Sequence, residues 1–442
     1  MSENTCNTLN SKGIQDKEDF PLGEVPESAR KGLWSLSVVL LGFTFFTSTM
    51  WAGGALGVSY RFWPDLIYVM LLGNLLLGIY VAILGYIAFK SGLNTVLMCR
   101  FCFGDLGSKW PDLVFGFTQI GWYAWGTAMI AFMFTELVGV NDSFSIPLMV
   151  FFGFFFCWTA YKGFKGLEIL ASVAVPMMLI LIIWSFIIAT RDVGGFTGLA
   201  KIIPTETMTF GTALTIVFGT FVSGGTQATN WSRFANNASV AIWASLFAFF
   251  LGNGLMIFAG AYGGYVYQEP DIVRVLSIQG LWLPAIIMLL LNVWTTQGNT
   301  IYNFSIAGCN LFRSEKRRYF SIGGAALGTL LAILGMYELL IPFIILLGTI
   351  IPPIGGVIMA DFFINHKGRY PKLSEVRFKK FNLVGITAYV LAALIANFCP
   401  GIAPINGIVS AVILYAIINK IFIYSGHPQN HEMSSLKCKN FL

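Results

Sequence analysis

Residues 42–54 read Gly42-Phe-Thr-Phe-Phe-Thr-Ser-Thr-Met-Trp51-Ala-Gly-Gly54, and they lie inside an apolar run at residues 34–59. A simple membrane anchor would carry leucine at this depth, whereas this stretch mixes glycine with hydroxyl and β-branched side chains. Glycine costs roughly 1 kcal/mol relative to alanine inside a helix, and hydroxyl groups compete for backbone partners. The stretch is therefore predicted to interrupt a membrane-spanning helix near its centre.

A second apolar run, at residues 209–231, contains Gly219-Thr-Phe-Val-Ser-Gly-Gly-Thr226. Its Gly-Gly pair could instead serve close packing between helices, which is common in membranes. The pairing of the two stretches favours interruption, because they lie in the first and the sixth apolar runs of the chain. Two five-span halves that repeat with inverted topology have their broken helices at these positions, with the substrate and the coupling ion near the midplane.

The composition predicts a membrane protein. The 442 residues are 56% hydrophobic and 11% charged, with a mean hydropathy of +0.73, whereas a soluble domain carries about 25% charged residues. Apolar runs long enough to cross a bilayer as helices recur along the chain. We place twelve spans at residues 34–59, 66–89, 112–138, 145–161, 169–190, 209–231, 238–267, 281–310, 319–337, 340–363, 381–399 and 403–424.

The predicted fold is an all-α integral membrane protein with a five-plus-five inverted repeat, broken helices 1 and 6, and two extra C-terminal helices. Its regions are an N-terminal tail (1–33), a first repeat (34–200), a second repeat (201–363), a loop with spans 11 and 12 (364–424), and a C-terminal tail (425–442). The first 33 residues lack the apolar core and the cleavage site of a signal peptide. We expect them to form a disordered tail.

The basic residues predict the orientation. With the N-terminus in the cytoplasm, every Lys and Arg except Arg61, Arg191, Lys201 and Arg274 is assigned to the cytoplasmic side. Cytoplasmic loops of membrane proteins carry such an excess. We expect a multi-pass protein of the inner or plasma membrane with both termini in the cytoplasm. The net charge of +6 therefore reflects topology, and the lipid bilayer is the expected partner, with no nucleic acid and no obligate protein partner.

Few ionisable residues lie deep in any span. Glu136, Glu168, Glu338 and Asp361 fall near predicted span ends. A proton relay through buried carboxylates is therefore poorly supported, although a protonated acid at the membrane edge, such as Asp361, stays open. Two cysteines form a lone CxxC at residues 99–102, which we interpret as a pair of thiols rather than a metal site, and no cofactor is expected.

Neutral oxygen ligands in the eighth span offer an ion site. The sequence Asn292-Val-Trp-Thr295-Thr296-Gln297-Gly298-Asn299 carries two hydroxyls, an amide and a glycine in about two helical turns. Carbonyls freed near Gly42 and Phe45, with the hydroxyls of Thr295 and Thr296, could dehydrate a sodium ion without a formal charge. The alternative is that these hydroxyls bond back to the preceding helical turn.

The third span offers a substrate site in Gln119-Ile-Gly-Trp122. Positions i and i+3 share a helix face, so a carboxamide lies beside a large aromatic ring. A planar heterocycle needs both, because stacking supplies contact area and paired hydrogen bonds supply identity. Phe46 and Phe221, at the two expected breaks, could cover its other side. The alternative is that Trp122 only packs or faces lipid.

Five segments resemble the nucleobase-cation symporter family, the purine and cytosine permeases, and in particular its cytosine branch. They are Val25-Pro-Glu-Ser-Ala-Arg-Lys-Gly32, Leu72-Gly-Asn-Leu-Leu-Leu-Gly-Ile-Tyr80, Thr118-Gln-Ile-Gly-Trp122, Asn292-Val-Trp-Thr-Thr296 and Ile351-Pro-Pro-Ile-Gly-Gly-Val-Ile-Met-Ala-Asp361. The resemblance runs from about Glu24 to Tyr424. It implies import of cytosine by cation symport, with sodium as the coupling ion and alternating access.

The resemblance also implies the site residues. The sodium ligands would be the carbonyls of Gly42, Phe45 and Asn292 and the hydroxyls of Thr295 and Thr296. The heterocycle would stack between Trp122 and Phe221. The predicted substrate-binding set is Phe46, Gln119, Trp122, Thr220, Phe221, Ser223 and Gln297.

Some positions depart from what the family leads us to expect. After the threonine pair, cytosine permeases continue Asn-Asp-Asn, whereas this chain has Gln297, Gly298 and Asn299, and Thr220 stands where a serine is expected. These changes leave the cargo open to a purine, a hydroxymethylpyrimidine or another heterocycle. A channel or a substrate sensor built on a transporter fold is a further alternative. An enzyme ranks lowest, because the spans carry no carboxylate pair, histidine cluster or nucleophile with a base.

Overall fold

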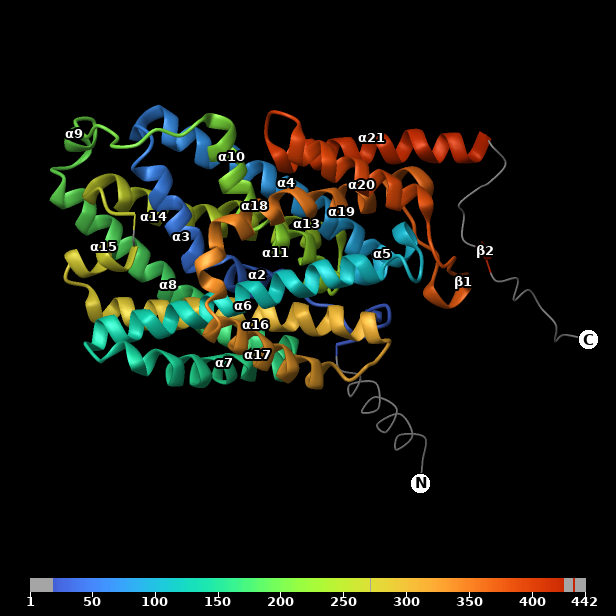
Figure 1. Cartoon of the computed structure of the whole chain (residues 1–442), viewed down its shortest axis with the longest axis horizontal. Coiled ribbons are helices and arrows are strands. Elements are labelled where there is room, and N and C mark those ends of the chain that lie inside the picture. Colours follow the sequence, from blue (N-terminus) through green and yellow to red (C-terminus); the bar gives the residue numbers. More distant parts are fainter. Residues whose placement is uncertain (1–18, 271, 425–431, 434–442) are drawn as a thin grey trace, which may run out of the picture.

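The computed structural model describes residues 19–270, 272–424 and 432–433, which are mostly helical (Figure 1). The first half of the chain forms α2 (Leu33–Thr44), α3 (Thr47–Gly57), α4 (Ile67–Ser91), α5 (Thr95–Phe103), α6 (Lys109–Val138), α7 (Ser145–Tyr161), α8 (Phe164–Asp192) and α9 (Phe196–Leu199). The second half forms α10 (Phe210–Gly219), α11 (Val222–Gln227), α12 (Thr229–Ser232), α13 (Ala238–Phe247), α14 (Asn253–Tyr267), α15 (Ile272–Ile278), α16 (Trp282–Phe312), α17 (Arg317–Ile333), α18 (Leu340–Ile350), α19 (Pro352–Ala360), α20 (Leu383–Phe398) and α21 (Ala403–Tyr424).

Shorter elements join these helices. The π-helical turns are η2 (Phe62–Leu66), η4 (Ala248–Gly252) and η6 (Asp361–Asn365), and the 3-10 turns are η1 (Glu27–Ala29), η3 (Asp142–Phe144), η5 (Met336–Leu339) and η7 (Leu373–Glu375). A short strand β1 (Val376–Arg377) pairs antiparallel with β2 (Glu432–Met433). The predicted all-α class is confirmed.

The helices have the length and polarity of membrane spans. Among the described residues, five segments are long and apolar enough to cross a bilayer: Phe62–Ser91, Phe164–Asp192, Ala238–Tyr267, Leu346–Asn365 and Ala403–Tyr424. Large apolar side chains face outwards, including Trp63 at 73% and Phe398 at 76% exposed. Soluble monomers rarely expose apolar surface on this scale, so lipid is the natural surrounding. The count of twelve spans stays a prediction.

The helices are arranged around α2 and the breaks near the centre of the molecule. α6, α7, α16 and α17 pack side by side along one side, whereas α20 and α21 pair at the opposite edge (Figure 1). α3 lies directly against α14. Here glycines are required, because a Cβ at Gly53 or Gly57 would lie 2.1 Å from a backbone carbonyl oxygen of α14. Such small residues let membrane helices approach closely.

The first predicted span is broken between α2 and α3. The two helices are bent by 58° relative to each other, and together they are apolar enough for one crossing. Phe45 and Phe46 leave the helical conformation, with ψ values of 90° and 131°. The prediction of an interrupted first span is confirmed. The break falls three residues after Gly42, which lies within α2.

The sixth predicted span is broken between α10 and α11. Thr220 remains helical, and Phe221 departs from the helix with φ −132° and ψ 13°. The Gly-Gly pair lies inside α11, after the break. A Cβ at Gly224 would lie 2.7 Å from the Phe43 ring, and one at Gly225 would lie 2.6 Å from Val81. Thus the span is interrupted, but the glycine pair serves close packing, the alternative reading of that pair.

The segment before α2 is ordered from residue 19 onwards. Val25 is buried, and its amide donates to the carbonyl of Gly92 at 3.0 Å. The buried guanidinium of Arg233 donates to the carbonyls of Asp19 and Phe20 at 2.7 and 2.9 Å. The prediction of a disordered tail through residue 33 is therefore wrong for residues 19–32. Residues 1–18, and 425–442 apart from 432–433, lie outside the described residues.

Candidate functional site

A small cavity lies between the two breaks. Its volume is about 20 Å³, enough for one water molecule but far from enough for a heterocycle. The residues that line it come from α2, α6, both breaks, α11 and α16: Phe43, Phe46, Gln119, Trp122, Thr220, Phe221, Gly224, Thr296 and Thr300. Five of the seven residues predicted to bind substrate therefore meet at one place.

Aromatic rings fill most of the space around this cavity. Phe46 contacts Trp122 edge-on with ring centres 5.8 Å apart, and it contacts Phe221 edge-on at 6.4 Å. Phe43 supports Phe221 from the side at 5.1 Å. Since Phe46 contacts both Trp122 and Phe221, a ligand stacked between those two rings would require Phe46 to move. In this structure Phe46 therefore occupies the space in which the heterocycle is predicted to stack.

The polar side chains of the site face one another. Gln119 and Ser223 are buried, and the Gln119 amide donates to the Ser223 hydroxyl at 3.4 Å. Ser223 does not itself line the cavity, but it is hydrogen-bonded to Gln119, which does. The Thr220 hydroxyl donates to the Val217 carbonyl at 2.8 Å. A carboxamide and a hydroxyl thus lie beside the aromatic rings, as hydrogen bonding to the edge of a heterocycle requires.

Gln297 points elsewhere. Its amide nitrogen donates to the Tyr123 carbonyl at 2.6 Å and to the Thr127 hydroxyl at 3.2 Å, so it ties α16 to α6. It does not line the cavity. Gly298 faces a different neighbour, because a Cβ there would lie 2.6 Å from the Thr159 hydroxyl of α7. The structure therefore separates Gln297 from the other predicted substrate residues, and in this state Gly298 too faces away from the cavity.

The five predicted sodium ligands lie on α2, on its C-terminal cap Phe45 and on α16, and these two helices are in contact. The Thr296 hydroxyl donates to the Phe45 carbonyl at 3.0 Å. The Thr295 hydroxyl donates to the Asn292 carbonyl at 2.9 Å, one turn back in its own helix. A Cβ added at Gly42 would lie 3.7 Å from the Cβ of Thr295. Thr295 therefore shows the bonding to the preceding turn that was the alternative, and Thr296 bridges two helices.

Sequence reasoning missed several residues of this region. The Thr47 hydroxyl donates to the Asn292 side-chain oxygen at 2.8 Å and so joins α3 to α16. Phe43 and Thr300 line the cavity. Thr47 stands in the hydroxyl-rich stretch that predicted the break, so the signal for it was present. Thr300 follows Thr296 by four residues and shares its helix face, which could also have pointed to it.

Asp361 lies outside the site. It is completely buried, and it accepts hydrogen bonds from Tyr370 at 2.9 Å, Tyr415 at 2.6 Å and Asn365 at 3.1 Å. These contacts join the end of α19 to α21 and to the loop that follows η6. Asp361 does not line the cavity. The structure gives it the surroundings of a carboxylate that holds helices together.

The CxxC cysteines are also buried, in α5. Burial raises the pKa of both the Cys99 and the Cys102 thiols well above the usual range. A thiol must lose its proton to bind a metal ion, so this environment opposes coordination. Within the described part of the chain, no group of three or more His, Cys, Asp or Glu side chains is arranged to hold a metal ion.

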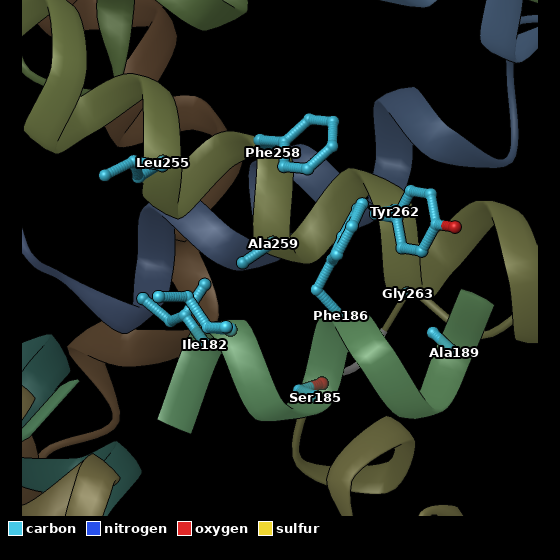
Figure 2. A pocket seen from close by; sticks show the side chains of 10 residues that line it. Ile182, Ser185, Phe186, Ala189, Leu255, Phe258, Ala259, Tyr262 and Gly263 are labelled. Carbon is cyan, nitrogen blue, oxygen red and sulfur yellow. The ribbon is translucent and has the colours of Figure 1, made fainter. Parts of the chain in front are cut away.

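A different cavity, of about 200 Å³, lies between α8 and α14 (Figure 2). Phe186 projects from α8 towards Tyr262 of α14, and the other lining side chains are mostly apolar. Its polar side chains already have partners: Ser185 donates to Gln279 at 2.7 Å, and Tyr262 is bonded to Thr190 at 2.8 Å. Ligand sites need polar groups that converge to fix orientation. This cavity is therefore not the candidate substrate site.

Comparisons with known proteins identify the family and the fold. The chain is 38% identical over 408 residues to the cytosine permease of Escherichia coli (strain K12), covering 92% of this chain and 96% of that protein. Its fold is similar to that of Mhp1, a nucleobase-cation-symport-1 family transporter, solved closed with bromovinylhydantoin bound; the TM-score is 0.79 at 17% identity, over 93% and 96% of the two chains.

A sodium-coupled sialic acid symporter, solved in a substrate-bound outward-open state, has the same fold with a TM-score of 0.70 at 13% identity, over 96% and 95% of the two chains. Residues 24–417 match the family described as permease for cytosine/purines, uracil, thiamine and allantoin. A match over most of the chain, together with the relative at 38% identity, is sufficient to assign the family. The chain therefore belongs to this permease family and is a multi-pass membrane transporter rather than an enzyme.

Proposed function

We propose that this protein imports cytosine together with a sodium ion by alternating access. The observation that carries the proposal is that the residues of the proposed ion site and those of the proposed substrate site are neighbours at the first break. On one side, the Thr296 hydroxyl reaches the Phe45 carbonyl. On the other, Phe46, the next residue, packs edge-on against Trp122 beside the cavity. An ion and a heterocycle bound here would be separated by a single peptide unit.

Sodium suits the oxygen atoms of this region. The proposed ligands are the carbonyls of Gly42, Phe45 and Asn292 and the hydroxyls of Thr295 and Thr296. Hard cations prefer such oxygen donors, and carbonyls near a helix break are free to turn towards an ion. Asp361, the acid left open for proton coupling, does not line the cavity. It already accepts hydrogen bonds from the side chains of Tyr370, Tyr415, Asn365 and Cys102, and it lies 3.3 Å from His366 Nδ1.

Coupling would follow from shared helices. A sodium ion held by α2 and α16 would order the first break, and Phe46 and Thr296, which line the cavity, would be ordered with it. The substrate would then bind to an already organised site, so each ligand would raise the affinity for the other. Release would follow when the opposite side opens. We place both termini in the cytoplasm and the protein in the inner or plasma membrane.

The cargo is proposed from the relative and from the cavity. Cytosine is the named substrate of the relative at 38% identity. The departures at Gln297 and Gly298 face α6 and α7 in this structure, so they weigh little against cytosine. Thr220 in place of the expected serine does line the cavity. Its extra methyl group changes the shape of the cavity wall. The second candidate substrate is therefore a differently shaped heterocycle, such as a purine or a hydroxymethylpyrimidine.

The test is uptake of radiolabelled cytosine into cells that lack their own carrier. Sodium is replaced by choline, and unlabelled adenine, uracil and hydroxymethylpyrimidine are added as competitors. Saturable, sodium-dependent uptake that only cytosine blocks is the expected result. Sodium-independent accumulation driven by a proton gradient would contradict the coupling. Uptake of another heterocycle instead of cytosine would contradict the cargo but leave the ion site standing.

A further inference from the structure

Two buried asparagines lie behind the second break. Asn74 of α4 is 1% exposed and Asn253, the first residue of α14, is fully buried. Neither lines the cavity between the breaks. Burying a carboxamide away from water is unfavourable unless its atoms are hydrogen-bonded. Here the two amides form a chain of hydrogen bonds that ends at the hydroxyl of Thr220, a residue that lines the cavity.

Backbone carbonyls at the two ends set the direction of this chain. Asn74 donates through Nδ2 to the Met70 carbonyl at 2.8 Å, so its Oδ1 is the atom that faces Asn253. Asn253 must then present its own Nδ2, which donates to Asn74 Oδ1 at 2.9 Å and to Thr220 Oγ1 at 3.1 Å. The Thr220 hydroxyl donates its proton to the Val217 carbonyl at 2.8 Å.

This direction determines what Thr220 can offer a ligand. A hydroxyl has one proton and two lone pairs. The Thr220 hydroxyl donates to the Val217 carbonyl at 2.8 Å, with Asn253 Oδ1 as a longer second acceptor at 3.5 Å, and one lone pair accepts from Asn253 Nδ2. Both acceptors of its proton are protein atoms, so the remaining lone pair is what Thr220 can offer a ligand as an acceptor.

The position of Asn253 connects it to both breaks. It directly follows the π-helical turn η4, and such turns occur often at functional sites. Phe249 of this turn contacts the Phe221 ring with centres 5.9 Å apart. Gly252 lies against the first break, because a Cβ there would lie 2.3 Å from the Thr44 hydroxyl. The same turn therefore supports the two broken helices and aims the Asn253 amide at Thr220.

We propose that Asn253, oriented by Asn74, is a positioning residue that fixes Thr220 as a hydrogen-bond acceptor and so selects heterocycles that present an N–H group at the second break. The inference rests on the proposed function, because it assumes that a heterocycle binds in this cavity. Cytosine carries such groups on N1 and on its exocyclic amine. An analogue without the N–H that meets Thr220 would leave the remaining lone pair unpaired in a closed site.

The experiment compares cytosine with two analogues that each lack one N–H position. These are 2-pyrimidinone, which has no exocyclic amine, and 1-methylcytosine. Each is measured as a competitor of cytosine uptake by the wild type, Asn253→Leu, Thr220→Val and Asn419→Leu. The last variant is the matched control, because Asn419 is a buried asparagine of α21 that does not line the cavity.

In the wild type, at least one analogue should compete tenfold or more worse than cytosine. In Asn253→Leu and Thr220→Val, that ratio should fall at least fivefold while KM for cytosine rises. Asn419→Leu should keep the wild-type ratio. If Asn253→Leu lowers only the maximal rate and leaves KM and both ratios unchanged, the residue is merely structural and the inference is overturned.

A second variant keeps the test open if Asn253→Leu does not fold. In Asn253→Asp, a protonated carboxyl group has one proton where the amide has two, and it can donate that proton to Thr220, whereas a carboxylate has none to donate. Ligand binding to the purified variant, relative to the wild type at the same pH, should therefore improve at least fivefold between pH 8 and pH 5.5. A ratio that does not change with pH would contradict the inference.

Wild-type uptake reports separately on the proposed function. If the wild type carries another heterocycle in place of cytosine, the cytosine proposal fails. The selectivity ratio is then measured with that heterocycle and an analogue of it that lacks one N–H group. A loss of selectivity in Asn253→Leu would still support the role of Asn253, and unchanged selectivity would overturn it.

Discussion

The two breaks occupy corresponding positions in the first and sixth predicted spans, yet they differ in shape and in partners. At the first, Phe45 and Phe46 are both non-helical, and the freed Phe45 carbonyl is met by the Thr296 hydroxyl. At the second, only Phe221 departs from the helix, and the polar contact is a side chain, Thr220, held by Asn253. The first break therefore exposes backbone acceptors, and the second presents side chains.

This difference suggests how one structural device can serve two ligands. Backbone carbonyls suit a small hard cation, because they are strong acceptors without a formal charge. A ring and a hydroxyl suit a planar heterocycle, because they supply stacking and one directed hydrogen bond. Changes at the first break should therefore act on ion dependence, and changes at the second should act on substrate affinity.

The largest effect is expected for Thr296→Val, which keeps the shape of the side chain but removes its hydroxyl. Hydrogen bonds and coordination to charged groups are worth roughly 1.5–3 kcal/mol, so the sodium concentration for half-maximal uptake should rise about 10- to 100-fold. Initial uptake rates across a sodium series measure this. The control is Thr135→Val, since Thr135 donates to Phe132 within its own helix. An unchanged sodium dependence would exclude Thr296 as a ligand.

The next effect is expected for Phe221→Ala. Losing one face of an aromatic sandwich removes about 0.5–1.5 kcal/mol beyond the area buried, so KM for the heterocycle should rise by at least about 2- to 13-fold. The sodium dependence, measured at saturating substrate, should change much less. Phe117→Ala serves as the control, because that ring is half exposed on α6. If Phe221→Ala changes the sodium dependence as strongly as KM, the division of roles between the breaks is wrong.

The same residues show how much of the two breaks could be predicted from the sequence. Hydroxyl and glycine content predicted that both spans would be interrupted, with Phe46 and Phe221 at the breaks, and the structure has the breaks at Phe45–Phe46 and Phe221. The Gly-Gly pair, a predicted signal of the second break, instead lies after it inside α11. Glycine inside a packed bundle answers two different needs, conformational freedom and close approach. Only the neighbouring helix decides between them, and in α11 that neighbour is the Phe43 ring.

The candidate site shows a similar limit. Gln119 and Trp122 could be placed on one face from their spacing alone, and the structure finds both at the cavity. Gln297 follows Thr296 by one position, which is about 100° around the helix. Sequence could not show which of these faces meets α2 and which meets α6. The family resemblance supplied the site as a set, but the direction of the Gln297 side chain depends on tertiary packing.

Gly224→Ala tests packing at the second break, and its expected effect is on stability and not on ion dependence or substrate affinity. The added Cβ would lie 2.7 Å from the Phe43 ring and 2.9 Å from the Phe221 ring. Overpacking of this kind costs about 1–3 kcal/mol. The midpoint of thermal unfolding of the purified protein should fall by a few degrees. Gly348→Ala is the control, since a Cβ there meets nothing within 4 Å. Equal midpoints for the two variants would mean that α11 can shift to make room.

The smallest effect is expected for Gln297→Leu, and it decides between the sequence prediction and the observed geometry. In this structure the Gln297 amide donates to the Tyr123 carbonyl and to Thr127, and its own oxygen is buried without a hydrogen-bond partner. Leucine would lose the first two contacts but would also remove the unpaired oxygen. These effects oppose each other, so the stability should change by about 1 kcal/mol or less.

Substrate preference is the sharper readout for this variant. Because Gln297 does not line the cavity, the ratio of inhibition constants for cytosine and uracil should stay within about threefold of the wild type, a difference of roughly 0.6 kcal/mol. Thr127→Val is the matched comparison, since it removes only the second partner of the amide. A change of tenfold or more in Gln297→Leu alone would mean that this side chain turns towards the substrate in another state of the transport cycle, as the sequence predicted.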